Sequence, residues 1–239
     1  MRFDAKSRHA KMVLESSGPW TDLGLTLPIF LGYHLSVIFL PMRNAADLVT
    51  RELVTLADNS LLAYGGLTLG IGAVYIALLV VLGRNHALRW ERFGLVAAEG
   101  VLYAIAMRFI AGYVVGRLFL SAGGEMTPFT GLVMSLGAGF YEEVVFRVGL
   151  FGLGARVFVM LFPLLTPFRK QLITIGWAVV AAAIFSGWHY IGAMGDPFDA
   201  KSFIFRWVCG LVFTVIYAFR GFAPVVWTHA LYDIWVLVL

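Results

Sequence analysis

The sequence predicts an all-α fold, a polytopic transmembrane helix bundle of about seven spans with room for an eighth. Of the 239 residues, 60% are hydrophobic and 13% are charged, and the mean hydropathy is +0.85. Soluble domains are closer to half apolar and a quarter charged. Apolar runs of about 20 residues, the length that crosses a bilayer as helix, recur along the chain. They are continuous, whereas the strands of a transmembrane barrel alternate.

Each apolar run begins and ends at polar or turn residues, and these residues separate the predicted spans. In order, the spans cover residues 23–40, 60–82, 95–120, 129–153, 172–191, 203–219 and 222–239. Gly66 and Gly70 have the small-xxx-small spacing that lets helices approach closely. The polar stretch 43–58 predicts a short interfacial helix. The short apolar segment 157–165 extends the fourth helix, re-enters the membrane or lies in the interface, so the span count stays open.

Basic residues predict the orientation. The N-terminus carries four Lys and Arg, and the second and fourth connections carry three each, whereas the intervening first, third and fifth connections carry two, none and one. Basic loops stay on the cytoplasmic side, so we expect a cytoplasmic N-terminus and, with seven spans, an outside C-terminus. This bias also accounts for the net charge of +4 without a nucleic-acid partner. The single cysteine, Cys209, excludes a disulfide framework.

The fourth predicted span contains Glu142, Glu143 and Arg147 in an otherwise apolar run. Each charge at mid-bilayer costs about 2.5–3.5 kcal/mol, so these side chains should face the bundle interior and be paired. Glu143 and Arg147 are four residues apart and predict a structural ion pair. Glu142 lies about 100° away around an α-helix and is free for another role. The alternative is that all three form an ionic clasp between helices.

Histidines occur in two later spans. His189 ends the fifth, while His229 and Asp233 lie four apart in the seventh. Each has an ordinary explanation. His189 would be an interfacial or capped residue at a helix end, and His229 and Asp233 would form a hydrogen bond within one helix. Together with Glu142 they supply a carboxylate and two imidazoles from three helices, which is what activation of a water molecule requires. We interpret His34 as structural, because it has no acidic neighbour at helical spacing.

Three ordered motifs carry a family resemblance. Glu142-Glu143-xxx-Arg147, Phe185-xxx-His189 and His229-xxx-Asp233 resemble the CPBP family of intramembrane proteases, which includes Rce1-type CAAX prenyl endopeptidases and abortive-infection proteins. The resemblance covers about residues 131–239. It implies a multi-pass protease of the cell membrane, acting on a membrane-associated peptide or protein, lipidated or not. The domain division it predicts is a cytoplasmic lead-in (1–20), N-terminal transmembrane helices (21–128) and a catalytic core (129–239).

The resemblance also implies roles for individual residues. Glu142 and His189 would activate water, and His229 with Asp233 would polarise the scissile carbonyl. Glu143, Arg147 and Phe185 would support the catalytic helix. The family often has Asn where Asp233 stands. Because an ionised carboxylate cannot donate a hydrogen bond, Asp233 either orients His229 or is protonated.

A metal and two other functions remain as alternatives. Glu142, His189 and His229 form the ligand set of a catalytic zinc site, yet the chain lacks HExxH, and we expect no required cofactor. The buried charges, with Glu99 and Arg108, could instead serve a proton- or ion-coupled transporter, although no inverted repeat is present. A non-catalytic immunity or scaffold protein of the same fold is the third possibility.

The predicted spans also pose a geometric problem. By these boundaries Glu142 is at mid-membrane, His229 is nearer the cytoplasmic end and His189 is nearer the outer end. Their convergence therefore requires a helix to break or shift. Gly187, Gly192 and segment 157–165 are the places where the sequence allows it.

Overall fold

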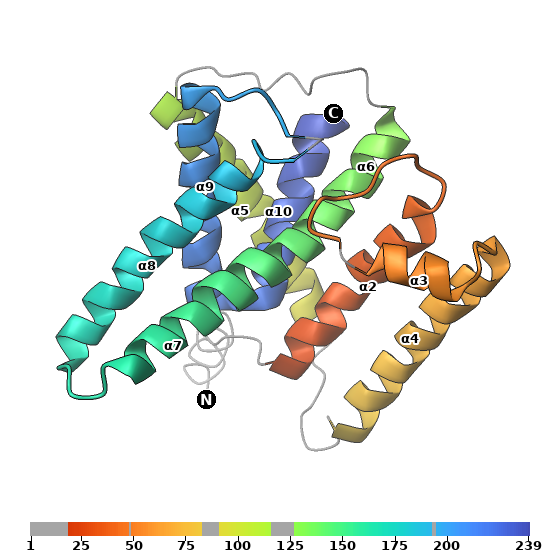
Figure 1. Ribbon diagram of the computed structural model, residues 1–239, viewed down its shortest axis with the longest axis horizontal. Helices are drawn as coiled ribbons and strands as arrows, with labels where there is room; N and C mark the ends of the chain where they lie inside the picture. The colour runs from red at the N-terminus through yellow and green to blue at the C-terminus, as the bar shows by residue number, and fades with distance from the viewer. Residues whose placement is uncertain (1–18, 48, 83–90, 116–126, 193–194) are drawn as a thin grey trace, which may run out of the picture.

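The computed structural model describes residues 19–47, 49–82, 91–115, 127–192 and 195–239, and throughout these the fold is helical, without strands (Figure 1). The predicted lead-in 1–20 falls almost wholly outside the described residues, so its cytoplasmic placement stays a prediction. The helices are α2 (Pro19–Val37), α3 (Thr50–Leu56), α4 (Leu61–Leu82), α5 (Glu91–Val115), α6 (Pro128–Gly137), η1 (Ala138–Leu153), α7 (Gly154–Leu161), α8 (Pro167–Trp188), α9 (Ala200–Arg220) and α10 (Phe222–Leu237).

The first part of segment 157–165, residues 157–161, extends the fourth helix, which is one of the three options that the sequence left open. Helices α6, η1 and α7 run on without interruption as one rod from Pro128 to Leu161, which crosses the molecule obliquely (green in Figure 1). A turn at 162–166 then leads into α8. The short helix predicted within 43–58 is also present, as α3.

Five helices in the described part of the chain are long and apolar enough to cross a membrane. Together with the absence of strands from the described residues, they confirm the all-helical fold and fit a membrane protein, but they do not confirm the predicted count of seven or eight spans. The five are α4, α5, the α6–η1–α7 rod, α8 and α9. Helix α10, the seventh predicted span, has 16 residues, fewer than the roughly 20 that a perpendicular crossing needs.

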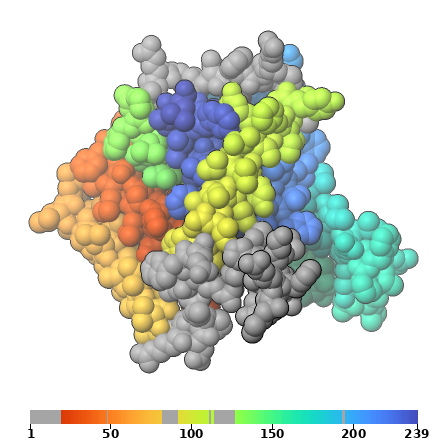
Figure 2. Space-filling model, turned by 180° about the vertical axis from the view of Figure 1, so that it is seen from behind, coloured from red at the N-terminus to blue at the C-terminus, as the bar shows by residue number. Residues whose placement is uncertain are grey.

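Helix α10 lies at the centre of the bundle, in contact with α2, α5, α6, η1 and α9. From behind, α5 crosses beside it (Figure 2). Gly139 permits the close approach of η1, because an added Cβ would lie 2.7 Å from the Cβ of Ala230. This approach carries the polar face of η1 against α10.

The start of α10 is fixed by a tight connection. Gly221 alone separates α9 from α10 and has a φ of +98°, a conformation that glycine adopts without strain. Its neighbour Phe222 donates its backbone N–H to Oδ2 of Asp22 at 2.8 Å. Asp22 therefore ties α2 to the N-terminus of α10, where an acceptor satisfies an otherwise unpaired donor.

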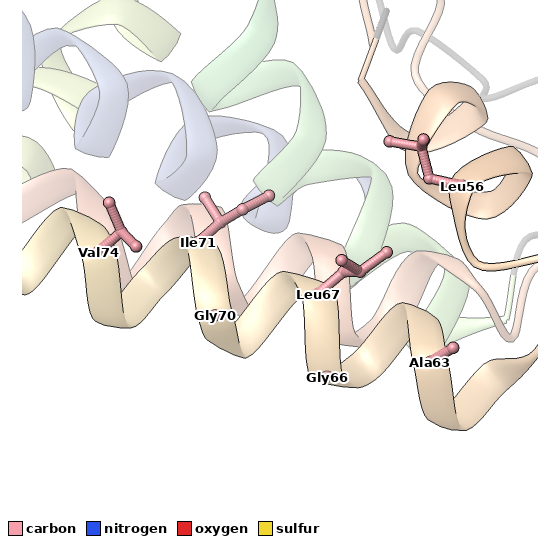
Figure 3. A pocket seen from close by; sticks show the side chains of 7 residues that line it. All are labelled: Leu56, Ala63, Gly66, Leu67, Gly70, Ile71 and Val74. Atoms are coloured by element: carbon pink, nitrogen blue, oxygen red, sulfur yellow. The ribbon is translucent and has the colours of Figure 1, made fainter.

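The outer face of α4 remains open. Gly66 and Gly70, which predict a close helix–helix approach, line an apolar groove of about 720 Å³ (Figure 3). A Cβ added at either glycine would meet nothing within 4 Å. No helix in the described part of the chain uses this spacing, so the predicted approach is not made there.

Candidate active site

The catalytic candidates on the fourth predicted span lie on η1, a π-helical stretch. Such stretches are rare, usually a single turn, and frequent at functional sites. Their i→i+5 hydrogen bonds put more residues in each turn, so successive side chains are separated by a smaller angle than in an α-helix. Glu142 and Glu143 both face the bundle interior, as predicted for charges inside an apolar span, with 7% and 0% of their surface exposed.

The predicted pair of Glu143 and Arg147 is present. Nη1 of Arg147 lies 3.1 Å from Oε1 of Glu143, and both side chains are fully buried. Nη2 of Arg147 donates to the carbonyl of Gly210 on α9 at 3.4 Å. The guanidinium also lies 4.2 Å from the ring centroid of Phe185 and 5.0 Å from that of Phe213. Arg147 thus connects η1 to α8 and α9.

Glu143 has a second partner that the sequence did not predict. Its Oε1 is 2.6 Å from Nδ1 of His229 on α10. A carboxylate can only accept, so the proton of this hydrogen bond lies on Nδ1 of the imidazole. The Nε2 edge of His229 is therefore turned away from Glu143 and toward Glu142 and Asp233.

Three side chains from three helices converge as predicted. Oε2 of Glu142 is 3.9 Å from Nε2 of His189 and 3.9 Å from Nε2 of His229. This oxygen is buried and has no hydrogen-bond partner among the described residues. The separations are too long for direct hydrogen bonds but suit a water molecule that bonds to all three atoms at about 2.7–3.0 Å.

His189 reaches the site because α8 ends just before it. The helix stops at Trp188, His189 caps it, and the chain turns at Gly192, where φ is +90°. Nδ1 of His189 lies 3.0 Å from the carbonyl oxygen of Phe185, which can only accept. Its proton is then on Nδ1, and Nε2 is left as an acceptor facing Glu142. The predicted break is thus at the end of α8, and Gly187 is still helical.

Asp233 and Phe185 also lie at the site. Oδ2 of Asp233 is 3.5 Å from Nε2 of His229, and the Asp233 side chain is 22% exposed. The ring of Phe185 packs edge-on against His189, with centroids 5.0 Å apart, and against Phe146 at 5.2 Å. Phe185 therefore supports His189 through its ring and its carbonyl.

One residue of the site, Asn44, was not predicted from the sequence. Its Nδ2 donates to Oε1 of Glu142 at 2.8 Å, across 98 residues of sequence. Asn44 lies in the connection between α2 and α3, within the polar stretch 43–58, which had predicted only an interfacial helix. His34 is structural as predicted: its ring contacts the hydroxyls of Tyr64 at 3.0 Å and Tyr141 at 2.5 Å.

The donor atoms fit a water better than a zinc ion. In a tetrahedral site with ligands about 2.0–2.1 Å from the metal, neighbouring donors lie about 3.3–3.5 Å apart. The two separations of 3.9 Å are wider. Within the described ranges no group of three His, Cys, Asp or Glu side chains has the spacing for a metal.

The other intramembrane charges have partners outside the site. Glu99 on α5 forms an ion pair with Arg220 on α9, with oxygen–nitrogen distances of 2.5 and 3.2 Å. The guanidinium of Arg108 lies 4.9 Å from the ring centroid of Trp235. Neither contact involves a residue of the candidate site.

Comparison with known proteins finds a match in the C-terminal half. Residues 124–235 match the family model described as type II CAAX prenyl endopeptidase Rce1-like. The matched range contains Glu142, His189, His229 and Asp233, whereas Asn44 lies outside it. No curated protein and no solved structure matches the chain.

Proposed function

We propose that the chain is an intramembrane endopeptidase that hydrolyses a peptide bond with an activated water, because residues 124–235 match the family model of Rce1-like type II CAAX prenyl endopeptidases. The family implies protease activity. The observation that carries the mechanism is the buried Oε2 of Glu142, which faces Nε2 of His189 and of His229 at 3.9 Å each.

Glu142 and His189 act as the base. A water between them is within hydrogen-bond reach of two acceptors, the Glu142 carboxylate and the free Nε2 of His189. As the water oxygen bonds to the scissile carbonyl carbon, its proton passes to one of these acceptors. When the carbon–nitrogen bond breaks, the same proton moves to the leaving amine, and the second water proton passes from the new carboxyl group to the amine or to solvent.

His229 stabilises the oxyanion. In its protonated form it donates from Nε2 toward the oxygen that becomes negative in the tetrahedral intermediate. Glu143 holds the ring through Nδ1 at 2.6 Å, and Asp233 flanks Nε2 at 3.5 Å. Because an ionised Asp233 cannot donate, it orients the imidazole and leaves the oxyanion contact to His229.

This mechanism needs no cofactor. Were a zinc ion held instead by Glu142, His189 and His229, it would supply a metal-bound water of lowered pKa. The 3.9 Å separations favour the metal-free form, and removal of divalent metal tests the choice.

The substrate that we propose is a membrane-associated peptide with a lipidated C-terminal motif. The family's name specifies a prenylated CAAX sequence, and two of the helices that build the site, the α6–η1–α7 rod and α8, are long and apolar enough to cross a bilayer. A lipid anchor would bring the scissile bond to the depth of Glu142 without a soluble binding domain.

A comparison of membrane proteomes tests the function. Cells with the wild-type chain should contain a cleaved product that is missing when Glu142→Gln replaces it, while the level of the variant is unchanged. Loss of proton-coupled uptake without an accumulated precursor would favour the transporter. A phenotype indifferent to Glu142→Gln would favour the immunity or scaffold protein.

A further inference from the structure

We propose that Asn44 is a positioning residue that holds one oxygen of Glu142, so that only the other faces the activated water. The catalytic consequence rests on the proposed function, whereas the contact itself does not. Asn44 is 7% exposed and belongs to the connection between α2 and α3, outside the range that matches the family.

The two hydrogen bonds of Asn44 fix the orientation of its amide. The backbone N–H of Ala46 donates to Oδ1 at 2.8 Å, and Nδ2 donates to Oε1 of Glu142 at 2.8 Å. Because a backbone N–H can only donate and a carboxylate can only accept, the reverse orientation would break both bonds. Asn44 therefore acts as a donor at the site.

The connection that carries Asn44 is anchored by Asp47. Oδ2 of Asp47 accepts from the hydroxyl of Tyr33 at 2.7 Å, and Oδ1 accepts from the backbone N–H of Thr50 at 2.9 Å. The backbone N–H of Asn44 donates to the same Tyr33 hydroxyl at 3.3 Å. Since Tyr33, Asp47 and Thr50 are buried, Asn44 is held in place before any substrate arrives.

Tyr33 also connects this anchor to the rod. Its ring lies against Gly137, the last residue of α6, where an added Cβ would overlap it. The connection is thus fixed to α2, to α3 and to the helix that carries Glu142.

This contact gives the two oxygens of Glu142 different tasks. Oε1 is engaged by Asn44, while Oε2 has no hydrogen-bond partner among the described residues and faces both imidazoles. A charge-assisted hydrogen bond restricts rotation of the carboxylate. Catalysis depends on such placement, because small displacements of a base from its water reduce the rate steeply.

The variant Asn44→Asp separates this role from loop structure. It keeps Oδ1 for Ala46 but replaces the donor with a second carboxylate oxygen beside Oε1. The two carboxylates repel or share a proton, and either outcome disables the base. We expect kcat to fall about 10- to 100-fold, as for loss of a hydrogen bond to a charged group, with KM within about 2-fold of wild type.

The matched control is Asn59→Asp in the exposed turn before α4, which should leave kcat and KM unchanged. Equal kcat in the two variants would overturn the proposal.

A second measurement needs no activity. Asn44→Asp should lower the melting temperature by about 2–4 °C relative to Asn59→Asp. Asn44→Asp combined with Glu142→Gln should recover it, because the amide introduced by Glu142→Gln can donate to the new carboxylate. Absence of proteolysis in the wild type would refute the proposed function. The recovery of the melting temperature in the double variant would then still test the contact between Asn44 and Glu142. No recovery in the double variant would refute the contact, whether or not the protein cleaves peptides.

Discussion

Glu143 accepts a hydrogen bond from Nδ1 of His229 at 2.6 Å, and this bond joins the charged motif of η1 to the histidine of α10. The same oxygen is 3.1 Å from Arg147. One carboxylate therefore balances a buried guanidinium and orients the imidazole that we propose to be catalytic, so its loss should affect both stability and chemistry.

Glu143→Gln should destabilise the protein strongly. It leaves Arg147 buried without a counter-charge, and breaking a buried pair costs about 3–5 kcal/mol. Thermal unfolding in detergent measures this, with Glu142→Gln as the matched control, because Glu142 balances no guanidinium at this distance. A melting temperature of Glu143→Gln equal to that of Glu142→Gln would contradict the assignment.

His189→Gln should reduce cleavage without unfolding the protein. The ring is at the end of α8 and its side chain is 24% exposed, so little packing is lost. Loss of a general base lowers kcat by about 10²–10⁴-fold. Steady-state kinetics and melting temperature, measured on the same preparation, check this prediction. A kcat within a few-fold of wild type would remove His189 from the mechanism.

Asp233→Asn should lower the activity less than Asp233→Ala. Asn can still accept a hydrogen bond beside Nε2 of His229 and can in addition donate to the oxyanion. We expect kcat within about 10-fold of wild type for Asp233→Asn, and a larger loss for Asp233→Ala, which removes every polar contact of this side chain. If Asn and Ala at this position lower kcat equally, Asp233 does not orient His229.

Removal of divalent metal should leave the rate unchanged. The separations of 3.9 Å suit a bridging water, so the proposed base is the protein's own. Cleavage is measured after incubation with 1,10-phenanthroline and dialysis, with metal content followed by mass spectrometry. Loss of activity that added zinc restores would establish the metal alternative.

Gly139→Ala should destabilise the bundle. The new Cβ would fall 2.7 Å from that of Ala230 and force η1 away from α10, and such overpacking costs about 1–3 kcal/mol. Gly66→Ala is the control, because nothing lies within 4 Å of its Cβ and alanine favours a helix. The two melting temperatures should shift in opposite directions. A Gly139→Ala variant as stable as wild type would show that the helices are less closely packed.

The helices themselves could be predicted because long apolar runs dominate this sequence. The run 60–82 corresponds to α4 (Leu61–Leu82), and 203–219 lies within α9 (Ala200–Arg220). The π-helical form of η1 could not be predicted, since helical periodicity assumes α geometry. Glu142 and Glu143 both lie on this stretch.

The candidate site was predictable only where polar residues stand out against apolar ones. Glu142, His189 and His229 are conspicuous inside predicted spans, and the structure brings them together. Asn44 stands in a polar stretch, where one more amide carries no signal, and its partner is 98 residues away. Glu143 was assigned to Arg147 alone because helical spacing shows neighbours on one helix and nothing across helices.

Cleavage of a prenylated peptide in H₂¹⁸O, by protein reconstituted in liposomes, tests most directly whether Glu142 activates water inside the bundle. The wild type should release a product whose new carboxyl group carries one ¹⁸O, detected by mass spectrometry. Glu142→Gln, correctly folded by its melting temperature, should form this product about 10²–10⁴-fold more slowly. Formation of the labelled product by Glu142→Gln at the wild-type rate would contradict the account.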